Sequence, residues 1–104
     1  MNPSLYRRID RVIHEKGRMA IMSLLAANSD CSFTEIKAML GLTDGNLSVH
    51  LSHLQKAGYI AISKSFVNRR PQTSCRLTEA GRKAFQEYLG ILETIIQASK
   101  KTDP

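Results

Sequence analysis

The sequence predicts a mainly α-helical domain with one small β-hairpin, in the element order α-α-(β)-α-α-β-β-α. Three observations lead to this prediction. Apolar residues recur at helical spacing along most of the 104 residues. After Gly58 the pattern changes to an approximate alternation of β-prone residues. Glycine, or a residue with a short polar side chain, stands at most of the expected helix ends.

Two helices are expected near the N-terminus, over residues 4–15 and residues 18–27, with Gly17 ending the first of them. Their apolar residues follow the i, i+3, i+4 pattern of helices that bury one face. Residues 31–33 are too few to form more than a fragment at the edge of a sheet.

A short helix over residues 34–40 and a longer one over residues 44–57 follow, joined by a tight turn that contains Gly41. Thr34 is expected to cap the N-terminus of the short helix. Two helices joined by such a turn form a helix-turn-helix, which we therefore expect over residues 34–57.

A β-hairpin is expected over residues 59–77, with its strands over residues 59–67 and 73–77. The loop between them would span residues 68–72, and Pro71 would stiffen it. A last helix is expected to start at the end of this hairpin, and residues 1–104 together are expected to form one domain.

The helix expected over residues 44–57 has an unusual outer face. On a helical wheel, the side opposite its leucines is short, polar and uncharged as far as Lys56. Small polar side chains permit a close approach to the DNA major groove, where Asn and Ser bond base edges and Val49 can touch a thymine methyl group. The predicted core face consists of Leu47, Leu51 and Leu54.

Positive charge is concentrated in the same part of the chain. The net charge is +6, from fifteen Lys and Arg against nine Asp and Glu, which makes nucleic acid the first partner to test. Between Gly45 and Leu77 there are five Lys and Arg and no acidic residue. Arg69 and Arg70 lie at the expected hairpin tip, from which arginine can enter a minor groove or bind phosphates.

Several motifs occur in order along the chain: RMAIMSLL at residues 18–25, FTEI with LGL within residues 33–42, GNLSVHL and AGYI within residues 45–60, KSF and RRPQT within residues 64–73, and LTEAGR at residues 77–82. Together, over about residues 17–90, they resemble the small winged-helix DNA-binding transcriptional regulators of the MarR and ArsR type. The resemblance implies a winged helix-turn-helix fold, with the hairpin as the wing, and dimerisation through the terminal helices.

The expected DNA contacts lie on the second helix of the helix-turn-helix, in the major groove, and on the wing, at the minor groove or the phosphate backbone. His50 lies about 60° from the core stripe, where its ring can serve either a backbone group or a phosphate. The expected DNA-binding residues are Thr43, Gly45, Asn46, Ser48, Val49, Ser52, His53, Lys56, Lys64, Arg69 and Arg70.

The last helix, expected over residues 78–99, would be roughly 33 Å long, whereas a domain of this size has a radius of gyration of about 13 Å. So small a body cannot cover the whole apolar stripe of this helix, and the helix over residues 4–15 has a similar excess. We therefore predict a homodimer in which these helices pair across a two-fold axis, matching a pseudo-palindromic double-stranded DNA operator. The predicted dimer interface consists of Leu5, Ile9, Val12, Phe85, Tyr88, Leu89, Leu92, Ile95 and Ile96.

Other classes of function are less well supported. No nucleophile–base arrangement or phosphate-binding glycine loop is visible, so no enzymatic activity, catalytic residue, metal or cofactor is predicted. No apolar run reaches the ~18–20 residues of a membrane span, and neither a signal peptide nor a disulfide framework is evident, so a cytoplasmic location is expected. Two alternatives stay open: an ArsR-like sensor of metal or redox state that uses Cys31 and Cys75, and a winged helix that binds only protein. Any small-molecule effector is unknown, and room for one is expected only at the dimer interface, near Tyr6, Tyr88 and Met22.

Overall fold

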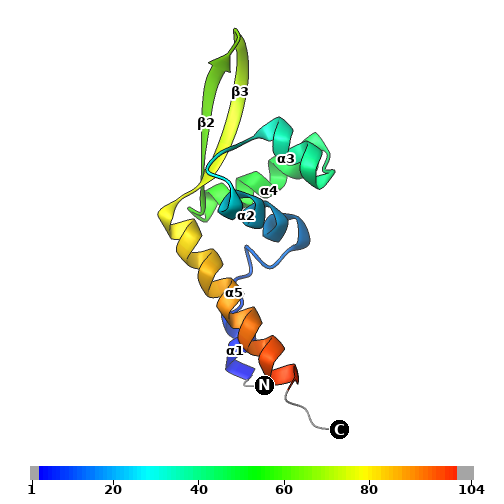
Figure 1. The fold of residues 1–104 in the computed structure, drawn as a ribbon, viewed down its shortest axis with the longest axis vertical. Coiled ribbons are helices and arrows are strands. Elements are labelled where there is room, and N and C mark those ends of the chain that lie inside the picture. Colours follow the sequence, from blue (N-terminus) through cyan, green and yellow to red (C-terminus); the bar gives the residue numbers. More distant parts are fainter. Residues whose placement is uncertain (1–2, 101–104) are drawn as a thin grey trace.

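The computed structural model describes residues 3–100, in which a long hairpin and a long C-terminal helix extend in opposite directions from a helical body (Figure 1). The molecule measures 61 × 25 × 22 Å, and its Cα radius of gyration of 16.0 Å exceeds the ~13 Å typical of a compact chain of this length. The predicted fold class, mainly α with a small β-hairpin, is confirmed. Residues 1–2 and 101–104 of the predicted domain lie outside the described residues.

The predicted helix over residues 4–15 is wrong. The first helix, α1, spans only Pro3–Arg8, and a turn follows it. The Asp10 carboxylate accepts hydrogen bonds from the backbone N–H groups of Val12 and Ile13, at 2.8 and 3.1 Å. An aspartate side chain that bonds nearby N–H groups offers the backbone an alternative to the helix, which explains why α1 ends so early.

The next helix, α2, spans Lys16–Ala27 and begins two residues earlier than expected. Its N-cap is Glu15, whose carboxylate accepts a hydrogen bond from the N–H of Arg18 at 2.8 Å. This hydrogen bond holds the pKa of Glu15 below its usual range. Gly17 therefore lies in the first turn of α2 and does not end the preceding helix.

The helix-turn-helix consists of α3, Phe33–Leu40, and α4, Asp44–Lys56. Thr34 is not the N-cap of α3: Ser32 is, and it forms a capping box with Glu35 in which each side chain bonds the other residue's backbone N–H. Gly41 ends α3 in the left-handed conformation, with φ 65°, as its position in the sequence predicts.

The sheet has three antiparallel strands in the order β1-β3-β2: β1 is Cys31–Ser32, β2 is Ile60–Val67 and β3 is Arg70–Leu77. The predicted five-residue loop is wrong, because β2 and β3 pair up to a two-residue turn at Asn68 and Arg69. Both turn residues have positive φ, the backbone that a tight hairpin of this kind requires.

The last helix, α5, spans Glu79–Lys100. It begins against the end of the hairpin, where Gly81 packs so closely that a Cβ atom would lie 2.0 Å from the carbonyl oxygen of Tyr59. Beyond the body, α1 lies beside α5 (Figure 1), and Arg8 and Glu87 form an ion pair of 3.6 Å between them.

The core lies between α2, α3, α4, the sheet and the first half of α5, and it includes the three predicted leucines of α4. No helix within residues 3–100 combines the length and apolarity that a membrane span requires. The main buried side chains are Ile13, Ile21, Met22, Leu25, Ile36, Leu47, Leu51, Leu54, Ile60, Cys75, Leu77, Phe85, Tyr88 and Ile91.

Candidate nucleic-acid interface

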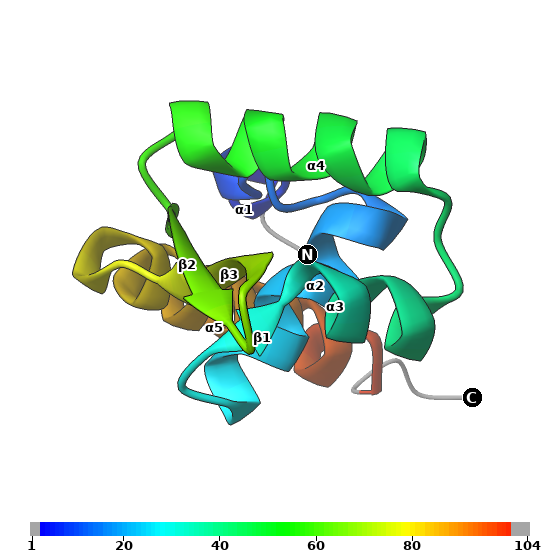
Figure 2. The same cartoon turned by 90° about the horizontal axis from the view of Figure 1, so that it is seen from above.

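The outer face of α4 is open to solvent along its whole length. Figure 2 shows α4 along one edge of the molecule, with no other element on its outer side. Leu47, Leu51 and Leu54 hold the opposite face in the core. At the start of the helix, the Thr43 hydroxyl accepts a hydrogen bond from the N–H of Asn46 at 3.1 Å. Packing and capping therefore fix which face of α4 is presented to solvent.

All eleven residues expected to contact DNA are exposed, and they fall into two groups. Eight lie on α4 or at its N-cap, where they share the outer surface of one helix. The other three lie on the hairpin: Lys64 within β2, Arg69 in the turn and Arg70 at the start of β3. The hairpin starts beside α4, but its tip projects well away from that helix (Figure 1), so the two groups are suited to different parts of a large partner.

The electrostatics of this surface favour an anionic partner. The one acidic residue of α4 is Asp44, and Lys37 neutralises it through an ion pair of 2.7 Å. From Gly45 to Leu77 the chain holds five Lys and Arg and no acidic residue. The surface formed by α4 and the hairpin therefore carries positive charge, and its one acidic residue, Asp44, is paired with Lys37.

Arg69 occupies a backbone conformation that disfavours it. Its φ is 65°, in the left-handed region, where an L side chain costs roughly 1–2 kcal/mol relative to glycine. Glycine is the residue that such hairpin turns prefer at this position. A strained arginine at the exposed tip of a hairpin is consistent with a role that glycine could not perform.

His50 contacts the N-terminus of α2, a role that the sequence left undecided. Its Nδ1 atom lies 3.6 Å from the Glu15 carboxylate and 3.5 Å from the Arg18 guanidinium. A Cβ atom on Gly17 would lie 2.6 Å from the His50 Nε2 atom, so only glycine permits this approach. Sequence reasoning missed Glu15, Gly17 and Arg18, which contact His50 of α4. It missed them because His50 is 32 or more residues away along the chain.

Cys31 and Cys75 are Cα partners on β1 and β3, as expected if residues 31–33 join the sheet of the hairpin. Both thiols are buried, and burial raises the pKa of each, that of Cys75 to about 11. Within residues 3–100 no group of three or more His, Cys, Asp or Glu side chains is placed to hold a metal ion. Two thiols are half of a tetrahedral zinc site.

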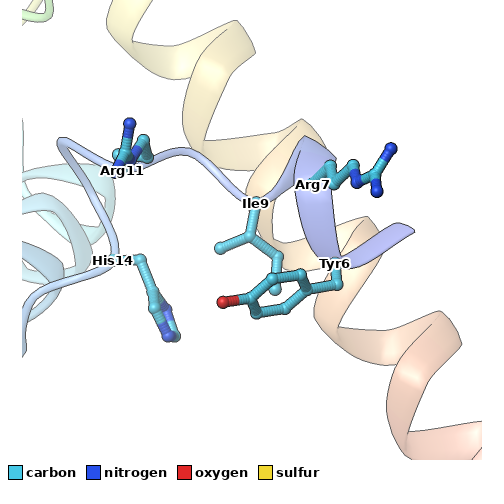
Figure 3. Close-up of a pocket in the computed structure, with 5 residues that line it drawn as sticks. All are labelled: Tyr6, Arg7, Ile9, Arg11 and His14. Atoms are coloured by element: carbon cyan, nitrogen blue, oxygen red, sulfur yellow. The ribbon is translucent and has the colours of Figure 1, made fainter. Parts of the chain in front are cut away.

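A pocket of about 480 Å³ lies beside the segment that joins α1 to α2. It is lined by Tyr6, Arg7, Ile9, Arg11 and His14 (Figure 3). In Figure 3 the Tyr6 hydroxyl and the His14 ring face each other across the pocket, and the two arginines stand at opposite ends of it.

The three residues predicted to lie near an effector cleft at the dimer interface, Tyr6, Tyr88 and Met22, have different positions in the single chain. Tyr6 lines the pocket. Tyr88 does not line it, but its hydroxyl lies 2.9 Å from the Nδ1 atom of the lining residue His14. Met22 is completely buried in the core, because α2 turns that face toward α4 and the sheet, and it does not line the pocket.

The predicted dimer surface also needs correction. Phe85 and Tyr88 are buried in the core of the single chain, where their rings stack 6.1 Å apart, so they offer no free surface. Farther along α5, Leu89 is 46% exposed and Ile96 is 50% exposed. The other predicted interface residues are partly buried: Leu5, Ile9, Val12, Leu92 and Ile95.

Comparison with known proteins agrees with this geometry. Residues 18–96 match the family model described as the winged helix DNA-binding domain. The chain is 34% identical over 93 residues to the uncharacterized protein MJ0432 of Methanocaldococcus jannaschii, which covers 89% of this chain and 98% of the relative.

Two solved structures show the same fold. A transcriptional regulator homologue from Pyrococcus horikoshii superposes with a TM-score of 0.86 at 26% identity, over 91% of this chain and 96% of that chain. The Bordetella bronchiseptica protein BpsR, whose DNA binding is regulated by 6-hydroxynicotinic acid, superposes with a TM-score of 0.70 at 17% identity, over 97% and 76%. With a family model that covers most of its length, the chain belongs to the winged helix DNA-binding domain family, and it is a small winged-helix transcriptional regulator and not an enzyme.

Proposed function

We propose that this protein regulates transcription as a homodimer that binds a pseudo-palindromic site in double-stranded DNA. In this proposal α4 enters the major groove, and the hairpin contacts the adjacent minor groove and phosphates. One observation carries the proposal: the open face of α4 bears short, uncharged side chains, and it adjoins a long basic hairpin in a segment without acidic residues. A protein that acts on chromosomal DNA would work in the cytoplasm of a prokaryotic cell.

The side chains of α4 fit direct reading of base edges. Asn46, Ser48 and Ser52 can donate and accept hydrogen bonds in the major groove, where each base pair presents a distinct pattern. Val49 is 55% exposed in the middle of this surface, and it offers a methyl contact for thymine. These residues would give sequence preference, because no other group within residues 3–100 bonds their side chains.

The basic side chains fit contacts that position the protein without reading sequence. Lys56 lies at the C-terminal end of α4, and Lys64, Arg69 and Arg70 lie along the hairpin. Contacts of this kind to phosphates make binding fall steeply as salt increases. An arginine at the hairpin tip can also enter a narrow, A·T-rich minor groove.

The terminal helices support the dimer. Beyond the body, α5 and α1 pack on each other, and both keep apolar side chains accessible, Leu89 and Ile96 among them. Contiguous apolar surface on an extended helix is typical of a protein–protein interface. A two-fold pairing there would place two copies of α4 about one DNA turn, roughly 34 Å, or a multiple of it apart.

Selection from random duplexes tests the proposed function. Repeated binding to immobilised protein is expected to enrich an inverted repeat, and the affinity for that repeat should fall at least about tenfold between 50 and 200 mM salt. If no sequence is enriched and the affinity does not change with salt, the proposal is wrong. Salt-independent capture of a protein would instead support the alternative of a protein-binding winged helix.

The pocket supports a second role, binding of a small anionic effector. The Tyr88 hydroxyl lies 2.9 Å from the His14 Nδ1 atom and 3.4 Å from the Met19 sulfur, so it holds the His14 ring at the edge of the pocket. Two arginines, Arg7 and Arg11, supply positive charge at the pocket. A hydroxylated aromatic carboxylate, the class that regulates BpsR, has the matching groups.

The pocket is also connected to α4. Its lining continues into residues that hold α2 and α4 together: Arg18 donates to the carbonyl oxygen of Val12, and the Glu15 carboxylate lies beside the His50 ring. Calorimetric titration with 6-hydroxynicotinic acid is expected to show binding that Arg11→Ala weakens about tenfold, and the acid should lower the affinity for the selected duplex. Absence of heat at millimolar concentration would exclude this compound as the effector.

A further inference from the structure

Phe66 is the most exposed large apolar side chain within residues 3–100, with 76% of its surface accessible. Because side chains alternate along a strand, Phe66 shares one face of β2 with Ile60, Ile62 and Lys64. The two isoleucines pack on the helical body, but Lys64 is already exposed. The core therefore ends before Phe66, and folding does not explain an aromatic ring at this position.

The hairpin holds this ring at a fixed place. The cross-strand Cα partner of Phe66 is Pro71, whose φ is restricted, and the turn beyond them has only two residues. Phe66 lies six residue steps along the strand from Ile60, a span of roughly 20 Å. The outer half of the hairpin extends past the helices, and no other element lies beside its tip (Figure 1). A preordered ring loses little entropy when it binds.

The surroundings of Phe66 are cationic. Lys64 precedes it by two residues on the same strand face, Arg69 and Arg70 follow at the tip, and no acidic residue occurs between Gly45 and Leu77. An apolar ring surrounded by cations matches a partner with a negative exterior and an apolar interior. Duplex DNA has this organisation, with phosphates outside and stacked bases within.

We propose that Phe66 is a wedge that enters the minor groove beside the α4 contact and partly unstacks one base step. This inference rests on the proposed function. Apolar side chains inserted in this way bend the duplex toward the major groove, and pyrimidine–purine steps yield most easily. Phe66 lies roughly 20 Å along β2 from Ile60, which closely follows the end of α4, and half a DNA turn, which separates the two grooves along one side of the helix, is roughly 17 Å. The wing would thus select a flexible step in each half-site without a hydrogen bond to its bases.

The test uses the full-length protein and its selected duplex, with three substitutions on the same hairpin. Phe66→Ala removes the wedge, Phe66→Leu retains an apolar wedge, and Val67→Ala removes apolar surface from the opposite strand face. Bending is measured by energy transfer between dyes at the duplex ends. Unstacking is measured by the fluorescence of 2-aminopurine placed in turn at each step flanking the α4 contact, and thermal melting reports the stability of each variant.

The wild-type protein is expected to bend the duplex and to increase 2-aminopurine fluorescence at one step. Phe66→Ala should abolish both signals and weaken binding about tenfold, Phe66→Leu should keep most of both, and Val67→Ala should change affinity less than threefold.

The inference is overturned if the wild type binds but Phe66→Ala leaves the bend and the fluorescence unchanged. It is also overturned if Phe66→Ala lowers the melting temperature, Phe66→Leu does not, and the loss of DNA affinity in each variant matches its loss of stability. Failure of the wild type to bind any duplex would instead count against the proposed function. Phe66-dependent flotation with anionic lipid vesicles, together with normal DNA bending by Phe66→Ala, would identify a membrane surface as the partner and refute the wedge.

Discussion

The exposed faces of α4 and α5 differ in chemistry, although both helices are amphipathic. On α4 the exposed side chains are short, polar and mostly uncharged, with one valine among them. On α5 the exposed surface mixes acidic and basic residues, such as Arg82, Lys83 and Glu87, with the accessible apolar residues Leu89 and Ile96. The two helices thus suit different partners.

This difference teaches that the outer face of a helix, and not its core face, indicates its partner. The core faces of both helices are ordinary apolar stripes that a folded domain requires. Short polar groups without charge are suited to base edges, whereas apolar residues between charged ones are suited to a second protein chain. Five experiments follow, from the largest expected effect to the smallest, that test whether the two surfaces are as distinct as this comparison requires.

Placing charge on the α5 surface should have the largest effect. The double substitution Leu89→Glu with Ile96→Glu introduces two carboxylates into the proposed dimer interface, and the affinity for the selected duplex should fall by about 100-fold or more, since both half-sites are needed for tight binding. Sedimentation should show a change from twice 11.6 kDa to a single chain of 11.6 kDa. A stable wild-type monomer at micromolar concentration would contradict the dimer.

Removing the charges of the hairpin tip should affect all DNA sequences alike. Arg69→Ala combined with Arg70→Ala is expected to weaken binding about 30-fold to specific and random duplexes and to reduce the dependence on salt. Arg82→Ala combined with Lys83→Ala removes the same charge from exposed positions on α5 and should change binding little. Equal effects of the two double variants would mean that net charge, and not the hairpin, attracts DNA.

Changing the polar groups of α4 should affect sequence preference. Asn46→Ala combined with Ser52→Ala is expected to lower the affinity for the selected duplex about tenfold and to leave binding to random DNA nearly unchanged. Ser23→Ala, at an exposed position on α2, is a matched control. The major-groove assignment of α4 would be contradicted if the double variant enriched the same sequence as the wild type with undiminished preference.

The hydrogen bond from Tyr59 to Asp10 should stabilise the fold, because it joins the segment after α4 to the segment between α1 and α2. It measures 2.5 Å and raises the pKa of Tyr59 to about 12, because the phenol donates its proton to a carboxylate. Tyr59→Phe is expected to lower the free energy of unfolding by about 1 kcal/mol at neutral pH. The folded pKa lies above the ordinary value of about 10, so this contribution is complete below pH ~10 and is lost as the pH rises toward 12. Urea unfolding of both proteins at pH 8 and pH 11.5 should therefore show a difference that shrinks with pH.

The smallest effect concerns the strained residue of the turn. Arg69→Gly relieves a positive φ and is expected to raise the free energy of unfolding by about 0.5–1 kcal/mol while weakening DNA binding several-fold. Arg69→Ala removes the same charge without relieving the backbone, and it should weaken binding without stabilising the fold. If Arg69→Gly binds DNA as well as the wild type, the arginine has no role at the hairpin tip.

Sequence reasoning succeeded where the deciding interactions are local. The left-handed Gly41, the leucine stripe of α4 and the start of β2 soon after Gly58 each depend on residues within one or two helical turns. It failed where a side chain competes with the backbone or where strands pair across the sheet. Asp10 ends the N-terminal helix early, and pairing of Pro71 with Phe66 extends the hairpin into the predicted loop.

The candidate site divides in the same way. The exposure of the predicted α4 and hairpin residues follows from the spacing of apolar residues and from the positions of charged residues. Both can be read from the sequence. The support of α4 by His50, Gly17 and Glu15, and the burial of Phe85 and Tyr88 within one chain, depend on contacts between distant segments. No local pattern contains those contacts.

The sequence by itself determined the fold class, the helix-turn-helix and the placement of positive charge, because periodicity, capping residues and charge are properties of neighbouring residues. Only the tertiary structure decided which apolar residues remain uncovered, because burial depends on where the body ends. The body ends at Lys64 on the hairpin and near Leu92 on α5, so Phe66 and Ile96 extend beyond it although their patterns continue those of the core. These two ends of the molecule are where we propose that it meets DNA and a second copy of itself.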